Sequence, residues 1–221
     1  MTHFLNFHTH IFPFPSEERG IYNLPVQEIP QWGTSRRNWV SVGIHPWYVD
    51  TENWQEELER IEKIATRENV KAIGECGLDR LIPLPIDQQL MVFEAQVAIA
   101  ERIRKPVIIH CVRAFNELLA WKNRYKPKVP LIVHGFNNKW ETAQQLLKHD
   151  FYFSLGTSLL QADSNAAKIL PNLPVSRLFL ENDDRPIPVQ KVYEAAAERL
   201  EMPVSVLQNQ IWTNFATVFK R

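Results

Sequence analysis

The sequence has few glycines, only two cysteines and no excess of charge of either sign. Seven glycines against fifteen prolines indicate stiff, defined loops and argue against low-complexity disorder. Cys76 and Cys111 both lie in apolar, strand-like segments, and nothing else in the sequence suggests a disulfide framework. The 25 basic and 25 acidic side chains give a formal net charge of zero, which argues against a strongly basic nucleic-acid coat but not against a local basic groove.

The sequence also has no signal peptide, no transmembrane apolar run and no lipidation motif. We therefore expect a cytoplasmic protein that does not bind a membrane, and no obligate protein partner is evident. A length of 221 residues with 45% hydrophobic side chains suits one sizeable core. Residues 1–221 are accordingly expected to form a single domain.

Apolar segments of strand length recur along the chain, and most are followed by a segment with helical spacing. This alternation is typical of a parallel sheet. Seven strands are clear, and an eighth at residues 21–24 is rudimentary. The clear strands are expected at residues 5–12, 39–45, 70–75, 106–110, 130–134, 151–155 and 177–183. Helices are expected at residues 52–67, 87–104, 114–125, 140–148, 159–170, 189–200 and 204–219.

This element order predicts an α/β protein with a TIM-like (β/α)8 barrel. Its first βα unit would be shortened, because the proline-rich and polar stretch 13–38 contains no convincing helix. A doubly wound open sheet is the alternative, but no glycine-rich phosphate loop follows the first strand to support it. A barrel would place functional residues at the carboxyl ends of its strands.

Five of the expected strands end in side chains that can bind a metal ion. At positions i and i+2 of the first strand, two histidines point to the same face. A lone histidine at a strand end is more often a hydrogen-bonded spacer, but gathering several imidazoles and carboxylates without a cation costs several kcal/mol of desolvation and repulsion. Mixed nitrogen and oxygen ligands suit Zn, Mn, Fe or Mg, and their number exceeds what one tetrahedral ion needs, which favours two metal ions. The candidate ligands are His8, His10, Glu75, His110, His134 and Asp183.

Several segments of the sequence, in this order, resemble the signatures of the TatD-like metal-dependent hydrolases. The resemblance extends from about Phe4 to Phe219 and misses mainly residues 11–38. Gln89, Phe93 and Gln96 match the family's helix signature as well. The other matching segments are His8-Thr9-His10, Gly43-Ile44-His45-Pro46-Trp47, Gly74-Glu75-Cys76-Gly77-Leu78-Asp79, Ile109-His110, Val133-His134-Gly135-Phe136 and Glu181-Asn182-Asp183, with Asn214 and Phe219 near the end.

The resemblance implies an amidohydrolase-type barrel with two divalent metal ions (Zn, Mg or Mn) that hydrolyses phosphodiesters. Many members of the family are deoxyribonucleases, so single-stranded DNA or another phosphodiester is the expected substrate. By this resemblance, His8, His10, Glu75 and Asp183 hold one metal ion. Glu75 bridges to a second ion held by His110 and His134, and His45 lies near the substrate phosphate.

Hydrolysis would use a water molecule that the metal ions acidify. Asp183 would accept the proton, with Glu75 and His45 as the other catalytic candidates; His45 could position the phosphate, protonate the leaving oxygen or serve only the structure. Strand alternation favours Asp183 over Asp184 as the ligand, since Asp183 lies two residues from Glu181.

Other polar and aromatic residues at strand ends have two interpretations. Asp79 is expected to orient a histidine. Arg80 and Arg113 could contact phosphate or remain solvated. Four aromatic residues could stack on bases, although core or rim packing is the more common role for such side chains. They are Phe12, Trp47, Phe136 and Trp140.

Two other functions remain open at this stage. One is a metal-dependent hydrolase of a small amide, ester or phosphate monoester, which the neutral net charge and the absence of the family's basic loop after residue 183 favour. The other is a barrel that retains a metal ion only for stability. The full ligand set argues against that last function, since purely structural sites are closed.

Overall fold

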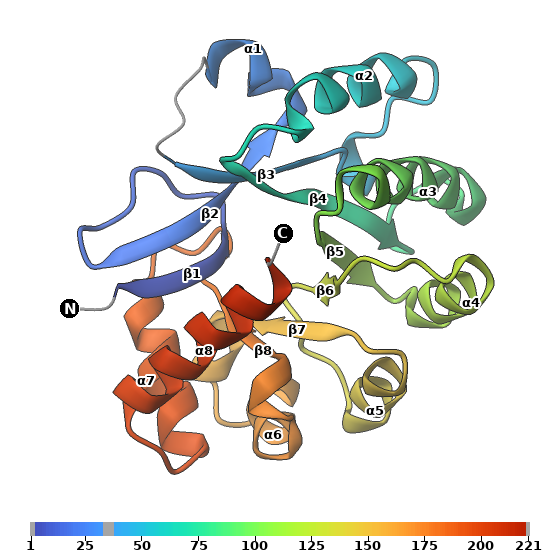
Figure 1. The fold of residues 1–221 in the computed structure, drawn as a ribbon. Helices are drawn as coiled ribbons and strands as arrows, with labels where there is room; N and C mark the ends of the chain where they lie inside the picture. Colours follow the sequence, from blue (N-terminus) through green and yellow to red (C-terminus); the bar gives the residue numbers. More distant parts are fainter. Residues whose placement is uncertain (1–2, 33–37, 220–221) are drawn as a thin grey trace. The chain divides into compact units, whose positions relative to one another are not determined.

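The computed structural model describes residues 3–32 and 38–219. Its eight strands belong to one sheet in the order β1-β2-β3-β4-β5-β6-β7-β8 (Figure 1). Thr9, the last residue of β1, forms a parallel bridge with Asp183, which follows β8. The first and last strands therefore meet, and the fold is the expected TIM-like (β/α)8 barrel. The strands are β1 Phe4–Thr9, β2 Glu18–Pro25, β3 Trp39–Gly43, β4 Val70–Asp79, β5 Val107–Val112, β6 Leu131–Val133, β7 Tyr152–Leu155 and β8 Leu178–Leu180.

From β2 onward, at least one helix follows each strand along the chain (Figure 1). They are α1 Ile29–Trp32, α2 Trp54–Ala65, α3 Ile86–Ile103, α4 Phe115–Tyr125, α5 Trp140–Lys148, α6 Asn165–Ile169, α7 Val189–Arg199 and α8 Val204–Val218. The 3₁₀ segments are η1 Val26–Glu28, η2 Pro46–Tyr48, η3 Thr157–Leu160, η4 Leu170–Asn172 and η5 Val175–Arg177. No helix among the described residues has the length and apolar character to cross a membrane.

The described chain divides into two compact units. The terminal unit comprises residues 3–22 and 133–219, and the central unit comprises residues 23–132 apart from 33–37. The dividing points fall inside β2 and β6. The expectation that residues 1–221 act as one domain stays a prediction.

In the terminal unit, α7 and α8 pack against β1. Phe7 of β1 stacks on Phe179 of β8 with 4.2 Å between the ring centroids. The buried Tyr193 of α7 donates its hydroxyl to the Leu5 carbonyl at 2.9 Å, which anchors the helix to β1. Asn214 of α8 donates to the Leu178 carbonyl at 2.8 Å. Both helices thus support the two strands from which the polar residues of this unit extend.

In the central unit, α3 packs against β4, and β4 pairs in parallel with β5. Phe93 of α3 contacts Trp121 of α4 with a centroid distance of 4.6 Å, and both rings are buried. Gly77 of β4 has φ +151°, and a Cβ atom there would lie 1.9 Å from the His110 carbonyl oxygen. Glycine is therefore required where β4 passes closest to β5.

Two expectations about individual elements have clear outcomes. The shortened first βα unit is confirmed: among the described residues no helix separates β1 from β2, and α1 has only four residues. The expected helix at residues 159–170 is wrong, because the segment breaks into η3, α6 and η4. Ser164 accepts a hydrogen bond from the Ala167 amide at 3.1 Å, so it caps a new helix start in the middle of the predicted one.

Candidate functional site

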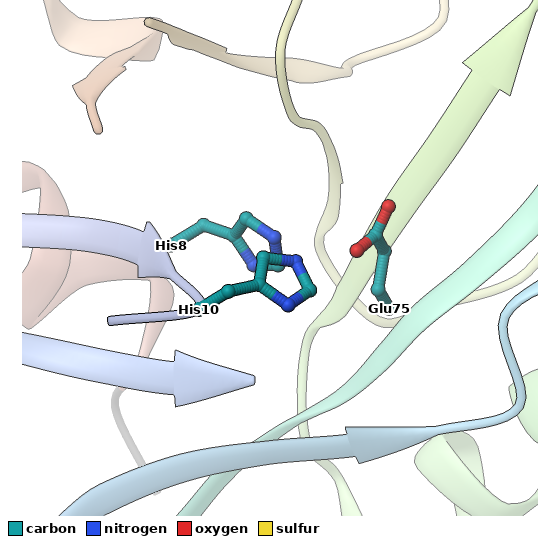
Figure 2. Close-up of side chains that lie close together, drawn as sticks. All are labelled: His8, His10 and Glu75. Carbon is teal, nitrogen blue, oxygen red and sulfur yellow. The ribbon is translucent and has the colours of Figure 1, made fainter. Parts of the chain in front are cut away.

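The carboxyl end of β1 carries two histidines of the terminal unit. His8 is fully buried and His10 is exposed, and both side chains extend to the same side of the strand end (Figure 2). Each Nε2 atom lies close to Asp183 Oδ1, at 3.6 Å for His8 and 3.5 Å for His10. The ring of His134, from the end of β6, lies 4.3 Å from that of His8. One ligand atom from each of His8, His134 and Asp183 lies within 4.8 Å of the others, a spacing that fits one metal ion.

The backbone holds Asp183 in place. Its φ of +55° is in the left-handed region, which aspartate tolerates better than most residues. The His10 amide donates to the Asp183 carbonyl at 3.0 Å, and the Asp183 amide donates to the His8 carbonyl at 3.2 Å. Asp184, the alternative ligand, instead pairs with Arg185 at 3.2 Å. The geometry therefore brings Asp183 to the histidines.

A buried carboxylate, Glu181, supports His134. Its Oε1 lies 3.3 Å from His134 Nδ1 and accepts the Gly135 amide at 2.7 Å. Burial raises the pKa of Glu181, but the hydrogen bond from His134 and the charges of His134 and His8 outweigh burial and lower this pKa overall. Glu181 thus stays ionised and orients the His134 ring through Nδ1.

The central unit contains a second set of imidazole and carboxylate groups. His45 Nε2 lies 3.2 Å from Glu75 Oε1, and His110 Nδ1 lies 3.0 Å from the same oxygen. Glu75, drawn on β4 in Figure 2, is buried, and the two histidines are half-buried. Ligand atoms of His45, Glu75 and His110 all lie within 4.8 Å of one another. This second set also fits a metal ion.

His110 lies between two carboxylates. Its Nε2 atom is 3.2 Å from Asp79 Oδ2, while its Nδ1 faces Glu75. A neutral imidazole has one N–H and can donate to only one of these carboxylates, so the arrangement suits a cation between the other ring nitrogen and its carboxylate. Burial raises the pKa of Asp79, but hydrogen bonds from the Trp47 indole, the Leu81 amide and His110 outweigh it and lower that pKa. Asp79 contacts a histidine, as expected.

Three buried amide side chains support the strand ends of the central unit. Gln96 of α3 accepts the Ile44 amide at 2.6 Å and donates to the Ile44 carbonyl at 3.2 Å. Seven residues earlier on the same helix, Gln89 accepts the Asp79 amide at 2.7 Å and donates to its carbonyl at 2.9 Å. Asn23 Oδ1 accepts the Glu75 amide at 2.9 Å. These bonds position the backbone beside His45, Asp79 and Glu75.

The expected ligands therefore fall into two groups, one in each unit. His8, His10, His134 and Asp183 gather in the terminal unit, and Glu75 and His110 gather in the central unit together with His45. Their roles as metal ligands, and any pairing between the units, stay predictions. The sequence pattern alone predicts no role for Glu181, Asn23, Gln89 and Gln96, although Glu181, Gln89 and Gln96 lie in segments that match the family's signatures.

A charged side chain and the two cysteines lie close to the strand ends as well. Arg80 forms an ion pair with Glu117 through its guanidinium, and its contact with phosphate stays a prediction. Burial raises the pKa of Cys111 and of Cys76 far above the usual thiol range, and neither forms a disulfide. Cys111 is therefore a neutral, small residue and no nucleophile.

Comparisons with known proteins agree on one family. A family model described as TatD related DNase matches residues 28–220. The 3'-5' ssDNA/RNA exonuclease TatD of Enterobacter lignolyticus is 33% identical over 153 residues, which are 66% of this chain and 58% of that protein. Deoxyribonuclease Tat-D of Schizosaccharomyces pombe is 29% identical over 156 residues, or 65% of this chain and 50% of that protein. The chain thus matches only about half of the length of these relatives.

Solved structures show the same fold. The TatD homologue YJJV from Escherichia coli has a TM-score of 0.82 at 20% identity, over 99% of this chain and 98% of that one. A TatD-family hydrolase from Entamoeba histolytica has a TM-score of 0.78 at 14% identity, again over 99% and 98%. At these identities the likeness concerns the fold alone.

Proposed function

The chain belongs to the TatD related DNase family, and from this premise we propose that it is a divalent-metal-dependent phosphodiesterase that removes nucleotides from single-stranded DNA. The observation that carries the proposal is the pair of ligand sets, one in each unit. Each combines two imidazoles and one carboxylate whose ligand atoms lie within 4.8 Å of one another. Divalent ions bound by nitrogen and oxygen ligands are the usual agents of phosphodiester hydrolysis.

We propose that His8, His10, His134 and Asp183 of the terminal unit would hold one metal ion. Glu75 and His110 of the central unit, which lie beside His45, are proposed to hold the other. Mn, Mg and Zn all suit this donor set, and the metal and the number of ions are part of the proposal. When bound, such ions acidify water and neutralise charge on phosphoryl oxygens.

The chain's own residues supply the remaining chemistry. Asp183 Oδ1, which lies within 3.6 Å of two histidine nitrogens, is proposed to accept the proton of the attacking water. His45 accepts the Trp47 amide at Nδ1, at 3.1 Å, so its Nε2 carries the ring proton when the imidazole is neutral. That N–H faces Glu75 Oε1 at 3.2 Å, and we propose that a phosphate oxygen or the leaving oxygen takes the place of this partner when substrate binds. Glu181 and Asp79 position His134 and His110.

The substrate assignment rests on the family and on its named relatives. The relative from Enterobacter lignolyticus is named a 3'-5' ssDNA/RNA exonuclease, and the relative from Schizosaccharomyces pombe is named a deoxyribonuclease. We propose single-stranded DNA as the substrate class, and a cytoplasmic location remains an expectation from the sequence.

The test is release of nucleotides from a 5'-labelled single-stranded oligonucleotide. The purified protein with added Mn or Mg should shorten the oligonucleotide, and a chelator should abolish the reaction. Asp183→Asn should lower the rate by at least about a hundredfold, since it removes a ligand and the proton acceptor together. The matched control is Asp184→Asn, which changes the adjacent carboxylate, paired with Arg185, and should retain the wild-type rate within about twofold.

Two results would contradict the proposal. Equal losses in Asp183→Asn and Asp184→Asn would show that the effect comes from the loop and not from the ligand set. A protein that binds metal, leaves DNA and RNA intact and cleaves a small ester or amide would instead be a small-molecule hydrolase.

A further inference from the structure

Trp47 combines high exposure with a fixed orientation. Its side chain is 57% exposed, in the short η2 segment directly after His45. Its indole Nε1 donates to Asp79 Oδ2 at 2.6 Å, and its backbone amide donates to His45 Nδ1 at 3.1 Å. An exposed aromatic ring is therefore held by bonds at its edge while much of its surface remains open to solvent.

The Trp47 ring borders the ligand set of the central unit. Its centroid lies 5.1 Å from that of His45 and 6.0 Å from that of His110. Two further apolar side chains of the same unit are exposed, Tyr48 at 65% and Leu81 at 61%, and the Leu81 amide bonds to the other oxygen of Asp79 at 2.8 Å. Burial of apolar area explains this position only in part, because more than half of the side chain is exposed.

We infer that the Trp47 ring is a stacking platform for a nucleobase of the substrate, next to the phosphate on which the reaction takes place. The inference rests on the proposed function and adds to it that the enzyme recognises bases and not only phosphodiesters. Stacking between a base and an aromatic ring tolerates every sequence, because each base has a π-face. The bond to Asp79 fixes the ring in advance, so that less conformational freedom is lost on binding.

The first test compares two substrates on one enzyme. One is a single-stranded oligonucleotide, and the other carries tetrahydrofuran abasic sites in place of its last three nucleotides. We expect kcat/KM of the wild-type protein to be roughly tenfold or more higher for the base-bearing strand, the size expected for one stacked base. Trp47→Leu should bring this ratio close to one, whereas Trp47→Phe, which keeps a ring, should keep most of it.

The second test needs no cleavage. A thymidine oligonucleotide with added Ca should quench the tryptophan fluorescence of the wild-type protein, and the abasic strand should quench it far less. Trp47→Phe should remove this quenching. The matched control is Trp212→Phe, which removes an indole of α8 that donates to the His3 carbonyl and should leave the quenching in place.

The outcomes separate this inference from the proposed function. One outcome would overturn the stacking platform and leave the nuclease in place. The protein would cleave the oligonucleotide, Trp47→Leu would keep the wild-type substrate ratio, and Trp47→Phe would keep the quenching. Quenching that depends on Trp47, in a protein that cleaves no oligonucleotide, would support the platform and refute the nuclease. A ratio lost equally in Trp47→Phe and Trp47→Leu would also overturn stacking, because it would assign the effect to the bond with Asp79.

Discussion

The side chain of Gln96 offers a test of how α3 supports the end of β3. It is fully buried, accepts the Ile44 amide at 2.6 Å and donates to the Ile44 carbonyl at 3.2 Å. Replacing it with leucine keeps the size and apolar packing of the side chain but leaves both backbone groups of Ile44 without this partner. Each buried polar group that loses its hydrogen bond costs about 1–3 kcal/mol, and the added apolar atoms recover about 1 kcal/mol. Two such groups cost about 2–6 kcal/mol, so we expect Gln96→Leu to lower the free energy of unfolding by about 1–5 kcal/mol.

Urea unfolding of the wild-type protein and the variant measures this difference, and hydrogen exchange reports on the Ile44 amide. That amide should exchange much faster in Gln96→Leu. The matched control is Gln88→Leu on the same helix, where the side chain is exposed and the change should stay within about 0.5 kcal/mol. A variant as stable as the wild-type protein, with an equally protected Ile44 amide, would refute the role of Gln96.

The remaining predictions concern a glycine and a buried carboxylate. Gly77→Ala should destabilise the protein by about 3 kcal/mol or more, because its Cβ would meet the His110 carbonyl oxygen. The control is Gly156→Ala, whose Cβ would have no neighbouring atom closer than 3.6 Å. In the same urea assay it should change the free energy of unfolding by less than about 1 kcal/mol. Burial raises the pKa of Glu18 despite a hydrogen bond from the Val189 amide, so the folded protein keeps a proton at pH values where the unfolded chain has lost it. The free energy of unfolding should therefore fall as the pH rises from the ordinary carboxyl pKa through the raised one. Glu18→Gln should remove this decline and be the more stable protein at neutral pH. Parallel pH profiles of the free energy of unfolding for the two proteins would contradict this prediction.

Much of the fold was predictable because apolar strands and amphipathic helices leave periodic patterns. Helix α5 matches its prediction to the residue. Strand β4 was expected to end at Glu75 but continues to Asp79, with Cys76 paired to Ile109 and Asp79 paired to Val112. Gly77 looks like a strand breaker in the sequence, yet it is needed where the two strands approach most closely.

The candidate site was only partly predictable. Histidines and carboxylates at strand ends are visible in the sequence because each follows an apolar run. The supporting amides are not visible in this way, since Gln96 bonds to Ile44 and Asn23 bonds to Glu75 across 52 residues in each case. Such bonds depend on the packing of distant segments and leave no periodic signal. The same holds for Glu181, whose role appears only beside His134 and Gly135.

The most direct test of the central claim is the metal content of the reconstituted protein. The apoprotein, incubated with Mn or Zn and freed of excess ions, should contain about two ions per chain by elemental analysis, since each unit contributes a ligand set. Asp183→Asn and His110→Gln should each reduce the content to about one ion, while Asp184→Asn should leave it unchanged. A wild-type chain that retains no metal, or variants that retain as much as the wild type, would contradict the account.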